Sequence, residues 1–496
     1  EFVPYLSVVL PSLFKVIENL LRDRKEEESA VDEASSLALF ATTDGKSQQK
    51  ELEKKQVTNT FEHEEVESAL GMLYVFITEL GQHYIDYVDS TANLLIRALN
   101  FSNSEKVRRH AIKSLGPLLV VVKQARPDNK ELLVKYANIF LDQIWKCTEA
   151  EAEAEELIHC IHGIIEIVEV CGRFMTLAEL EIFSVKTLGV LASSDSRKAD
   201  NQTIKGKEDC DEDEIEALDG DTDQEENLHV AVAELIGMLF KTHKELTLGL
   251  AALLYSDVLA KVLSPTVSDK MHKFGLYIID DMIEHLGIEL IPNEWPALSE
   301  ALIKYATDKT PYVRQAAIYG IGMLAIKSKE AFNLIAEVCL VKIIEALKRQ
   351  KGENEHPKQF DFAREAAIAA LGKIISSGAK VNVNLLIPEW VNLLPMQKDK
   401  PEGRKQHDLL TELILRGNAA LVLGENGERV GKVISIFAII LQTKLSNPEI
   451  EKKIVQILKF LITDEKTKPL VANATKNLTL LQKQRLEDVL KAHSDQ

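Results

Sequence analysis

The sequence predicts an all-α fold in which pairs of helices stack into a solenoid, and three observations support this. Hydrophobic residues make up 46% of the 496 residues, but aromatic residues make up only 6%, with 23 glycines and 14 prolines. That composition favours helices over strands. Apolar residues recur every three or four positions along most of the chain, which is the period of an amphipathic helix. A helical motif of fixed spacing also occurs three times.

The repeated motif places an alanine three residues after an arginine and a glycine eight residues after it. It is found within Ser104–Leu119, Asp308–Ala325 and Phe362–Ile375, as Arg108/Ala111/Gly116, Arg314/Ala317/Gly322 and Arg364/Ala367/Gly372. Its small residues let a neighbouring helix approach closely. We expect the three arginines to pair with a turn aspartate of the adjacent repeat, so that they form a structural ladder along the stack.

The helices pair off as helix A and helix B, with about 40 to 50 residues per pair, the period of HEAT and armadillo repeats. We therefore expect a HEAT-repeat right-handed α-solenoid, a superhelix of about nine antiparallel helix pairs. Residues 1–496 form one array, with a C-terminal capping helix within 470–496. Two insertions separate an A helix from its B helix, a polar one at 23–60 and an acidic one at 193–226. B helices are expected to line the concave face.

Composition excludes several classes of protein. The net charge of −18 argues against direct binding to nucleic acid, which needs a basic surface, and favours basic partners. Five scattered cysteines without a CxxC pair indicate reduced thiols in an intracellular protein. No run of apolar residues is long enough to span a membrane. The chain does not begin with Met and is expected to be part of a longer protein.

The strongest compositional feature is the run Glu208–Glu226, which holds twelve carboxylates and no lysine or arginine. Such a run repels itself and is expected to stay extended and solvated. It either docks a basic surface or is a spacer that keeps the protein soluble, and the residues alone favour neither. The candidate partner-binding carboxylates are Glu208, Asp209, Asp211, Glu212, Asp213, Glu214, Glu216, Asp219, Asp221 and Asp223.

A second acidic group lies on a predicted B helix. Asp280, Asp281 and Glu284 would face the concave side, where three carboxylates could bind a basic ligand. The alternative, a solvated face with ordinary salt bridges, is equally consistent with the sequence.

No arrangement of residues indicates catalysis. No Ser/His/Asp or Cys/His constellation stands out, so we expect no catalytic residue, no enzyme activity and no cofactor. His159, Cys160 and His162 lie on one predicted helix without further ligands at a metal-binding spacing, so core packing is favoured and no metal site is expected.

Several segments resemble the importin beta (karyopherin) superfamily. They are YVRQAAIYGIGMLA, IIDDMIEHLG, AAIAALGKII and the stretch from Pro388 that includes LVLGENGERVGKVISIFAIIL. The order of motifs is similar to the C-terminal half of the importin-5 (importin subunit beta-3) branch, and the resemblance extends over nearly the whole chain.

The resemblance implies a nuclear transport receptor that carries basic cargo such as ribosomal proteins and histones. It further implies phenylalanine-glycine nucleoporins and RanGTP as partners, with RanGTP releasing the cargo, and shuttling between cytoplasm and nucleus through the nuclear pore. We expect a monomer. The alternative is a static HEAT-repeat scaffold that organises a multiprotein complex.

Overall fold

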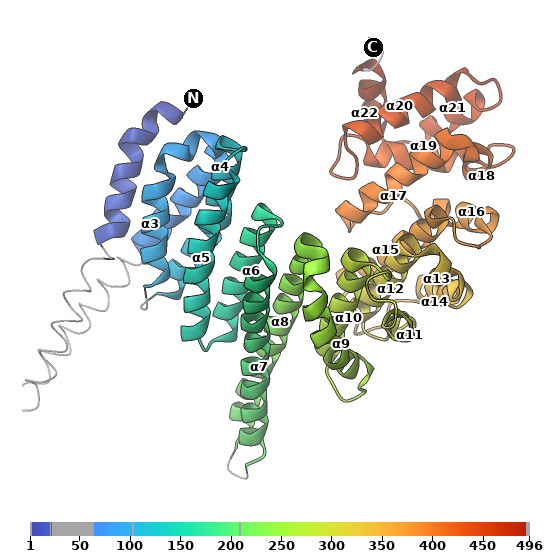
Figure 1. Ribbon diagram of the computed structural model, residues 1–496. Helices are drawn as coiled ribbons and strands as arrows, with labels where there is room; N and C mark the ends of the chain where they lie inside the picture. The colour runs from blue at the N-terminus through green and yellow to red at the C-terminus, as the bar shows by residue number, and fades with distance from the viewer. Residues whose placement is uncertain (1, 20, 22–63, 102–103, 208–209, 493–496) are drawn as a thin grey trace, which may run out of the picture. The chain divides into compact units, whose positions relative to one another are not determined.

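The computed structural model describes residues 2–19, 21, 64–101, 104–207 and 210–492 (Figure 1). Every regular element within these ranges is a helix. The chain divides into two compact units, Glu1–Leu250 (unit 1) and Ala251–Gln496 (unit 2). The insertion expected at 23–60 lies outside the described residues.

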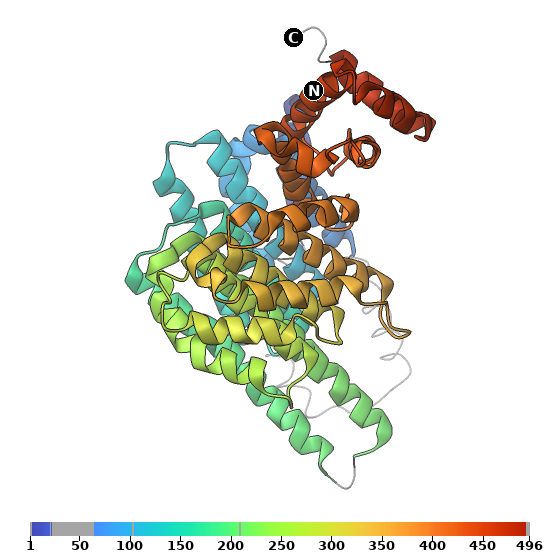
Figure 2. The ribbon, with the colours of Figure 1, turned by 90° about the vertical axis from the view of Figure 1, so that its right-hand side faces the viewer.

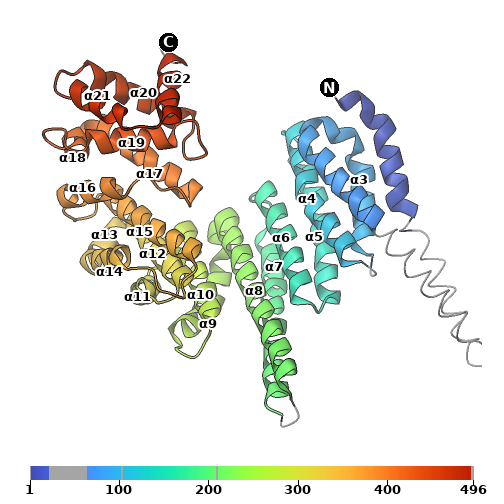
Figure 3. The same cartoon turned by 180° about the vertical axis from the view of Figure 1, so that it is seen from behind.

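Unit 1 consists of paired helices in two layers. Residues 6–19 and 64–80 are helical. They are followed by η3 (Gly81–Tyr87), α3 (Val88–Leu99), α4 (Glu105–Ala125), α5 (Lys130–Ala150), α6 (Ala154–Cys171), α7 (Leu177–Lys205), α8 (Glu212–His243) and η4 (Lys244–Thr247). Helices α4, α6 and α8 pack side by side, and α3, α5 and α7 pack against this row (Figure 3). The predicted alternation of A and B helices is therefore present in this unit.

Unit 2 repeats the same arrangement with shorter helices. Its helices are α9 (Leu248–Leu263, which starts at the boundary), α10 (Asp269–Asp281), η5 (Met282–Leu286), α11 (Trp295–Tyr305), α12 (Pro311–Lys327), α13 (Lys329–Asn333), α14 (Ala336–Lys348), α15 (Pro357–Ser377), α16 (Val383–Leu393), α17 (Lys400–Leu413), η6 (Ile414–Asn418), α18 (Ala419–Leu423), α19 (Val430–Ile440) and α20 (Pro448–Thr463). Helices α10, α12, α15 and α17 form one row, each in contact with the next, within the yellow-green to orange part of Figure 2. The predicted all-α solenoid architecture is confirmed within the units.

Helix α12 shows why the repeated motif is rich in small residues. Twelve of its residues are buried, because it packs against α10 on one side and α15 on the other. A Cβ atom on Gly322 would lie 3.1 Å from Ala370 Cα of α15. The glycine therefore allows the two helix backbones to approach closely, as its place in the motif predicts.

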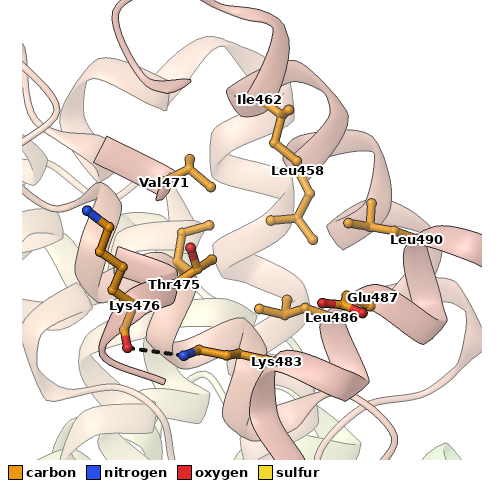
Figure 4. A pocket seen from close by; sticks show the side chains of 10 residues that line it. Leu458, Ile462, Val471, Thr475, Lys476, Lys483, Leu486, Glu487 and Leu490 are labelled. Atoms are coloured by element: carbon orange, nitrogen blue, oxygen red, sulfur yellow. Dashed lines mark hydrogen bonds between the residues drawn. The ribbon is translucent and has the colours of Figure 1, made fainter. Parts of the chain in front are cut away.

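The C-terminal segment expected to hold one capping helix contains two, α21 (Lys468–Lys476) and α22 (Leu480–Ala492). They pack on α19 and α20. Between these four helices lies a cavity of about 320 Å³ whose walls include Leu458, Val471, Leu486 and Leu490 (Figure 4). Aliphatic side chains therefore join the last two helices to the rest of unit 2.

The arginine ladder exists at two of its three expected positions, with a different partner. Arg108 donates to the backbone oxygen of Phe101 at 3.3 Å and to Glu151 Oε2 at 3.1 Å. Arg314 donates to the backbone oxygen of Asp308 at 2.5 Å and pairs with Glu355 at 3.6 Å. Each arginine thus joins the turn before its own helix to a glutamate in the next helix connection.

The expected role of the turn aspartate is wrong in its detail. The Asp308 carboxylate accepts the backbone N–H of Thr310 at 2.7 Å, so it shapes the turn that precedes α12. The backbone oxygen of Asp308, rather than its carboxylate, accepts the hydrogen bond from the Arg314 guanidinium. Glu355 supplies the negative charge that pairs with Arg314.

The third ladder prediction, Arg364, is also wrong. Arg364 is exposed and makes no ion pair with the described residues. The reason is the start of the helix: Arg108 and Arg314 are the fourth residues of α4 and α12, whereas Arg364 is the eighth residue of α15. One further turn of helix places Arg364 too far along the axis to reach the preceding loop.

Candidate functional site

The acidic run is helical, which corrects the expectation that it is extended. The end of α7 (193–205) and the beginning of α8 (212–226) form an antiparallel pair, called here the acidic hairpin, which projects beyond the neighbouring helices of unit 1 (Figures 1 and 3). Glu208 and Asp209, two of the predicted site residues, lie outside the described residues.

Helix formation by so many carboxylates has a local cause. Asp211 caps α8, and its Oδ1 accepts the backbone N–H of Glu214 at 2.8 Å. Glu212, Asp213 and Glu214 occupy the first turn. Negative side chains stabilise this end of a helix because the backbone N–H groups there carry partial positive charge. The position of the acids at a helix start therefore outweighs their mutual repulsion.

The hairpin tip presents its charge to solvent. All eight of the predicted site carboxylates that the structure describes are exposed: Asp211, Glu212, Asp213, Glu214, Glu216, Asp219, Asp221 and Asp223. Lys205 of α7 pairs with Asp219. The described part of the tip is therefore a helical and strongly negative surface.

An ion pair between a buried glutamate and a partly exposed arginine holds the two helices together below the tip. Glu225 is only 5% exposed, and Arg197 binds it through two parallel contacts of 2.5 and 2.9 Å. Ser194 Oγ donates to the same carboxylate at 2.6 Å. Bidentate pairing fixes geometry as well as charge. This contact of Arg197 and Ser194 with Glu225, called here the staple, was not predicted, because all three residues lie within the expected insertion.

The second predicted acidic group lies in unit 2, where α10 runs into the single π-turn η5. Asp280 is buried, Asp281 lies 3.5 Å from His285, and Glu284 accepts a hydrogen bond of 2.7 Å from the Tyr319 hydroxyl. The structure thus brings all three predicted residues together. For Asp280, the alternative of a solvated surface residue is wrong.

Asp280 and Asp281, but not Glu284, border a cavity of about 290 Å³ between α10, α12, α15 and α17, called here the carboxylate pocket. Its polar lining residues are Tyr277, Asp280, Asp281, Gln315, Tyr319, Asp399 and Glu402. Asp399 and Glu402 were not predicted, because they lie more than 100 residues further along the chain and only stacking of the helices brings them near.

One cation lies beside the pocket and was also missed. The Lys373 ammonium is 3.3 Å from Glu402 Oε1 and 4.1 Å from the centre of the Tyr319 ring. Both Lys373 and Glu402 are buried. Burial lowers the pKa of Lys373, although the neighbouring Glu402 opposes the change. A carboxylate and an aromatic face therefore hold an ammonium group at this place.

Asp280 differs from the other carboxylates because it lacks such a partner. Its Oδ1 is buried and accepts no hydrogen bond from the described residues. Burial, followed by the nearby charges of Asp281 and Glu284, raises the pKa of Asp280 well above its usual value, although Lys373 acts in the opposite direction. The ionised form of this side chain is therefore disfavoured in the folded chain.

Replacing Asp280 by asparagine is expected to raise the thermal midpoint more at about pH 8 than at about pH 4.5. A raised pKa in the folded state means that the wild-type chain loses stability as pH rises through that pKa, whereas the asparagine variant does not. Thermal unfolding followed by circular dichroism across this range checks the result. Asp488→Asn, at an exposed position in the same unit, is the control. A stability difference that stays constant with pH would contradict the interpretation.

The helix that carries His159, Cys160 and His162 was expected to serve core packing rather than metal binding. Cys160 is buried, and His162 lies 3.8 Å from Glu234. Among the residues that the structure describes, no group of three or more His, Cys, Asp or Glu side chains is arranged to hold a metal ion. None of the described helices has the length and apolar character needed to cross a membrane.

Comparisons with known proteins agree with the expected resemblance. No protein-family model matches the chain. It is 24% identical over 412 residues to the Dictyostelium discoideum protein named "Probable importin-5 homolog", an alignment that covers 78% of this chain and 37% of that protein.

Solved structures of Kap121p have the same fold. Kap121p alone gives a TM-score of 0.67 at 18% identity, covering 99% of this chain and 42% of Kap121p. Kap121p bound to RanGTP gives 0.68 at 17% identity, covering 98% and 42%. The chain thus spans less than half the length of these relatives. The chain is thus similar in sequence to a protein named as an importin-5 homolog, and it shares the fold of the karyopherin Kap121p.

Proposed function

We propose that this chain is part of a nuclear transport receptor of the importin beta type, which carries basic cargo proteins through nuclear pores under RanGTP control. The similarity to an importin-5 homolog supports the receptor class. Kap121p, which shares the fold, has been crystallised with RanGTP, with Nup53p and with Pho4p. By analogy, we propose RanGTP, phenylalanine-glycine nucleoporins and basic cargo such as histones and ribosomal proteins as partners.

The acidic hairpin is the observation that carries the proposed cargo class. Eight exposed carboxylates lie on one helix, and the pair of Arg197 with the buried Glu225 at the hairpin base joins that helix to α7. A solvated spacer needs no such staple. Charge of one sign on a fixed scaffold instead suits a partner of opposite charge, since complementary potentials favour the correct complex and disfavour acidic competitors.

Neutralising the tip is expected to weaken binding of a basic cargo at least about tenfold at low salt and to flatten its salt dependence. The variant changes Glu212, Asp213, Glu214 and Glu216 to the corresponding amides and leaves the cap Asp211 and the staple in place. Affinity for a labelled core histone, measured from about 50 to about 300 mM NaCl, checks the result.

A matched control removes the same charge elsewhere in unit 1. Asp128, Glu131, Glu153 and Glu181 are exposed and lie outside the hairpin. Their four amide substitutions are expected to change the affinity by less than about twofold at moderate salt, where charges beyond about 8–10 Å are screened. Equal losses in the two variants would show that net charge alone is recognised, and would remove the hairpin from the proposal.

RanGTP control is tested with the full-length protein, because the chain spans less than half of its relatives. Cargo captured from a lysate is expected to be released by RanGTP and retained with RanGDP. Cargo that stays bound in both nucleotide states would contradict a transport receptor and favour a static scaffold.

A further inference from the structure

We propose that the cavity between α19, α20, α21 and α22, called here the α22 groove, docks an amphipathic helix of a partner protein whose apolar residues are flanked by Asp and Glu. Such a partner has the opposite charge to the basic cargo of the proposed function, so the inference goes beyond that function and does not depend on it. The groove lies within unit 2, and each of the four helices contributes lining residues (Figure 4).

The floor of the groove is aliphatic. Ile434, Leu458, Val471 and Leu486 line it and are buried. Ile462 also lines it but is 39% exposed. Apolar surface that is removed from water contributes about 25 cal/mol per Å² to binding or folding. The groove therefore offers a partner apolar surface that the described helices leave partly uncovered.

The groove has the length of a short helix. Lys483 and Leu490 both line it and are seven residues apart in α22, which spans about 10 Å at 1.5 Å per residue. Leu480, three residues before Lys483 and on the same face of α22, is 83% exposed. An amphipathic helix enters an apolar groove with residues at i, i+3 or i+4, and i+7, which occupy two turns. A helix of this kind therefore matches the groove in length.

The rim of the groove carries uncompensated positive charge. Lys476 and Lys483 line it, and neither makes an ion pair with the described residues. Lys483 Nζ donates instead to the backbone oxygen of Lys476 at 3.2 Å (Figure 4). Glu487 also lines the groove, but it pairs with Lys491 at 3.8 Å. The two lysines therefore leave a place for carboxylates from outside.

The surrounding sequence has the same sign of charge. Residues 466–492 hold six lysine or arginine residues and two acidic residues, whereas the whole chain carries a net charge of −18. Lys466 and Lys468 are exposed, Arg485 is half-buried, and none of the three forms an ion pair within the part of the chain that the structure describes. Complementary potentials favour a partner of opposite charge and disfavour one of like charge. An acidic amphipathic helix satisfies both the apolar floor and the cationic rim.

The test uses a fluorescein-labelled peptide of about 15 residues, long enough to form a helix, made of alanine, leucine and glutamate. Its leucines stand at i, i+4 and i+7, with glutamates beside them, and binding to the complete chain is followed by fluorescence anisotropy. Changing both Lys476 and Lys483 to glutamine is expected to weaken binding about five- to tenfold and to flatten its salt dependence, because two charge pairs are lost. Thr475→Phe keeps every charge but fills the groove, and is expected to cause a similar loss.

A matched control removes the same charge elsewhere in unit 2. Lys351 and Lys380 are exposed and lie in loops outside the groove. Changing both to glutamine is expected to alter the affinity less than twofold. An equal loss in this control overturns the proposal, because the probe would then report net charge alone.

The remaining outcomes separate the two features of the groove. Unchanged affinity in the Lys476/Lys483 variant and in Thr475→Phe, with circular dichroism showing folded protein, overturns the proposal. Loss in Thr475→Phe alone shows an apolar site without a role for the lysines, so the acidic partner is wrong. Loss in the lysine variant alone places the probe outside the groove. A peptide with glutamine in place of glutamate, or a phenylalanine-glycine peptide, that binds as tightly as the acidic probe also rules out the acidic partner.

Discussion

Replacing Arg314 by alanine is expected to lower the free energy of unfolding by about 3 kcal/mol, the range found when one partner of a buried ion pair is removed. Arg314 is 2% exposed, donates to two backbone oxygens in the turn at 308–309 and pairs with Glu355. Its removal leaves those oxygens without a donor in a buried place. Urea unfolding followed by circular dichroism measures the loss.

The loss also has a predicted pH dependence. Burial raises the pKa of Glu355, but the Gly352 backbone N–H and the guanidinium groups of Arg314 and Arg349 together hold it below its usual value. A lowered pKa contributes stability above the unfolded-state pKa that is lost as pH falls through the folded value. The difference between wild type and Arg314→Ala is therefore expected to shrink in acid.

Arg364→Ala provides a matched control, since Arg364 has the same place in the sequence motif. It is exposed, and its substitution is expected to change the free energy of unfolding by no more than about 0.5 kcal/mol. Similar losses in Arg314→Ala and Arg364→Ala would show that the buried contacts of Arg314 do not carry the effect.

Replacing Gly320 by alanine is expected to destabilise the chain by about 2 kcal/mol, as overpacking of a filled core does. Helix propensity alone predicts the opposite sign, since alanine is favoured over glycine inside a helix by about 1 kcal/mol. The new methyl group would overlap Asp280 Oδ1 and lie 2.7 and 2.9 Å from the two terminal carbons of Leu302. Packing therefore outweighs propensity at this position.

Gly220→Ala in the acidic hairpin separates the effect of helix propensity from the effect of packing. Gly220 lies within α8, and a Cβ atom there meets nothing within 4 Å. Only propensity acts on it, so the substitution is expected to stabilise the chain by up to about 1 kcal/mol. Thermal unfolding of both variants checks the opposite signs, and a stabilising Gly320→Ala would contradict the packing around Asp280.

Much of the fold could be predicted from the sequence, because helix period and motif spacing are local properties. The motif predicts contacts of Arg108 and Arg314 with turn aspartates, whereas the structure pairs these arginines with Glu151 and Glu355. The failure at Arg364 shows the limit of spacing: α15 begins at Pro357, seven residues before this arginine. A motif fixes the distance between residues, whereas the reach of a side chain depends on where its helix begins.

The candidate sites likewise combine features that the local sequence predicts with features that depend on which helices pack together. The charge of the acidic run was evident from its composition, but its helical form depends on a cap at Asp211 and on a partner, Arg197, from another helix. Asp280 was found as a candidate because it lies in an unusual acidic motif. Lys373 and Glu402 were not, because their role depends on which helices stack against α12.

The staple at the base of the hairpin also bears on the order of events when a partner arrives. Glu212 and Glu225 are thirteen residues apart in one continuous helix, so at 1.5 Å per residue the tip stands about 20 Å beyond the staple. Electrostatic attraction is screened over about 8 Å at physiological ionic strength. The charge of the tip would therefore attract a basic partner before that partner contacts the helices at the hairpin base. We expect the hairpin to govern the rate of capture, and the lifetime of the complex to be set by contacts made afterwards.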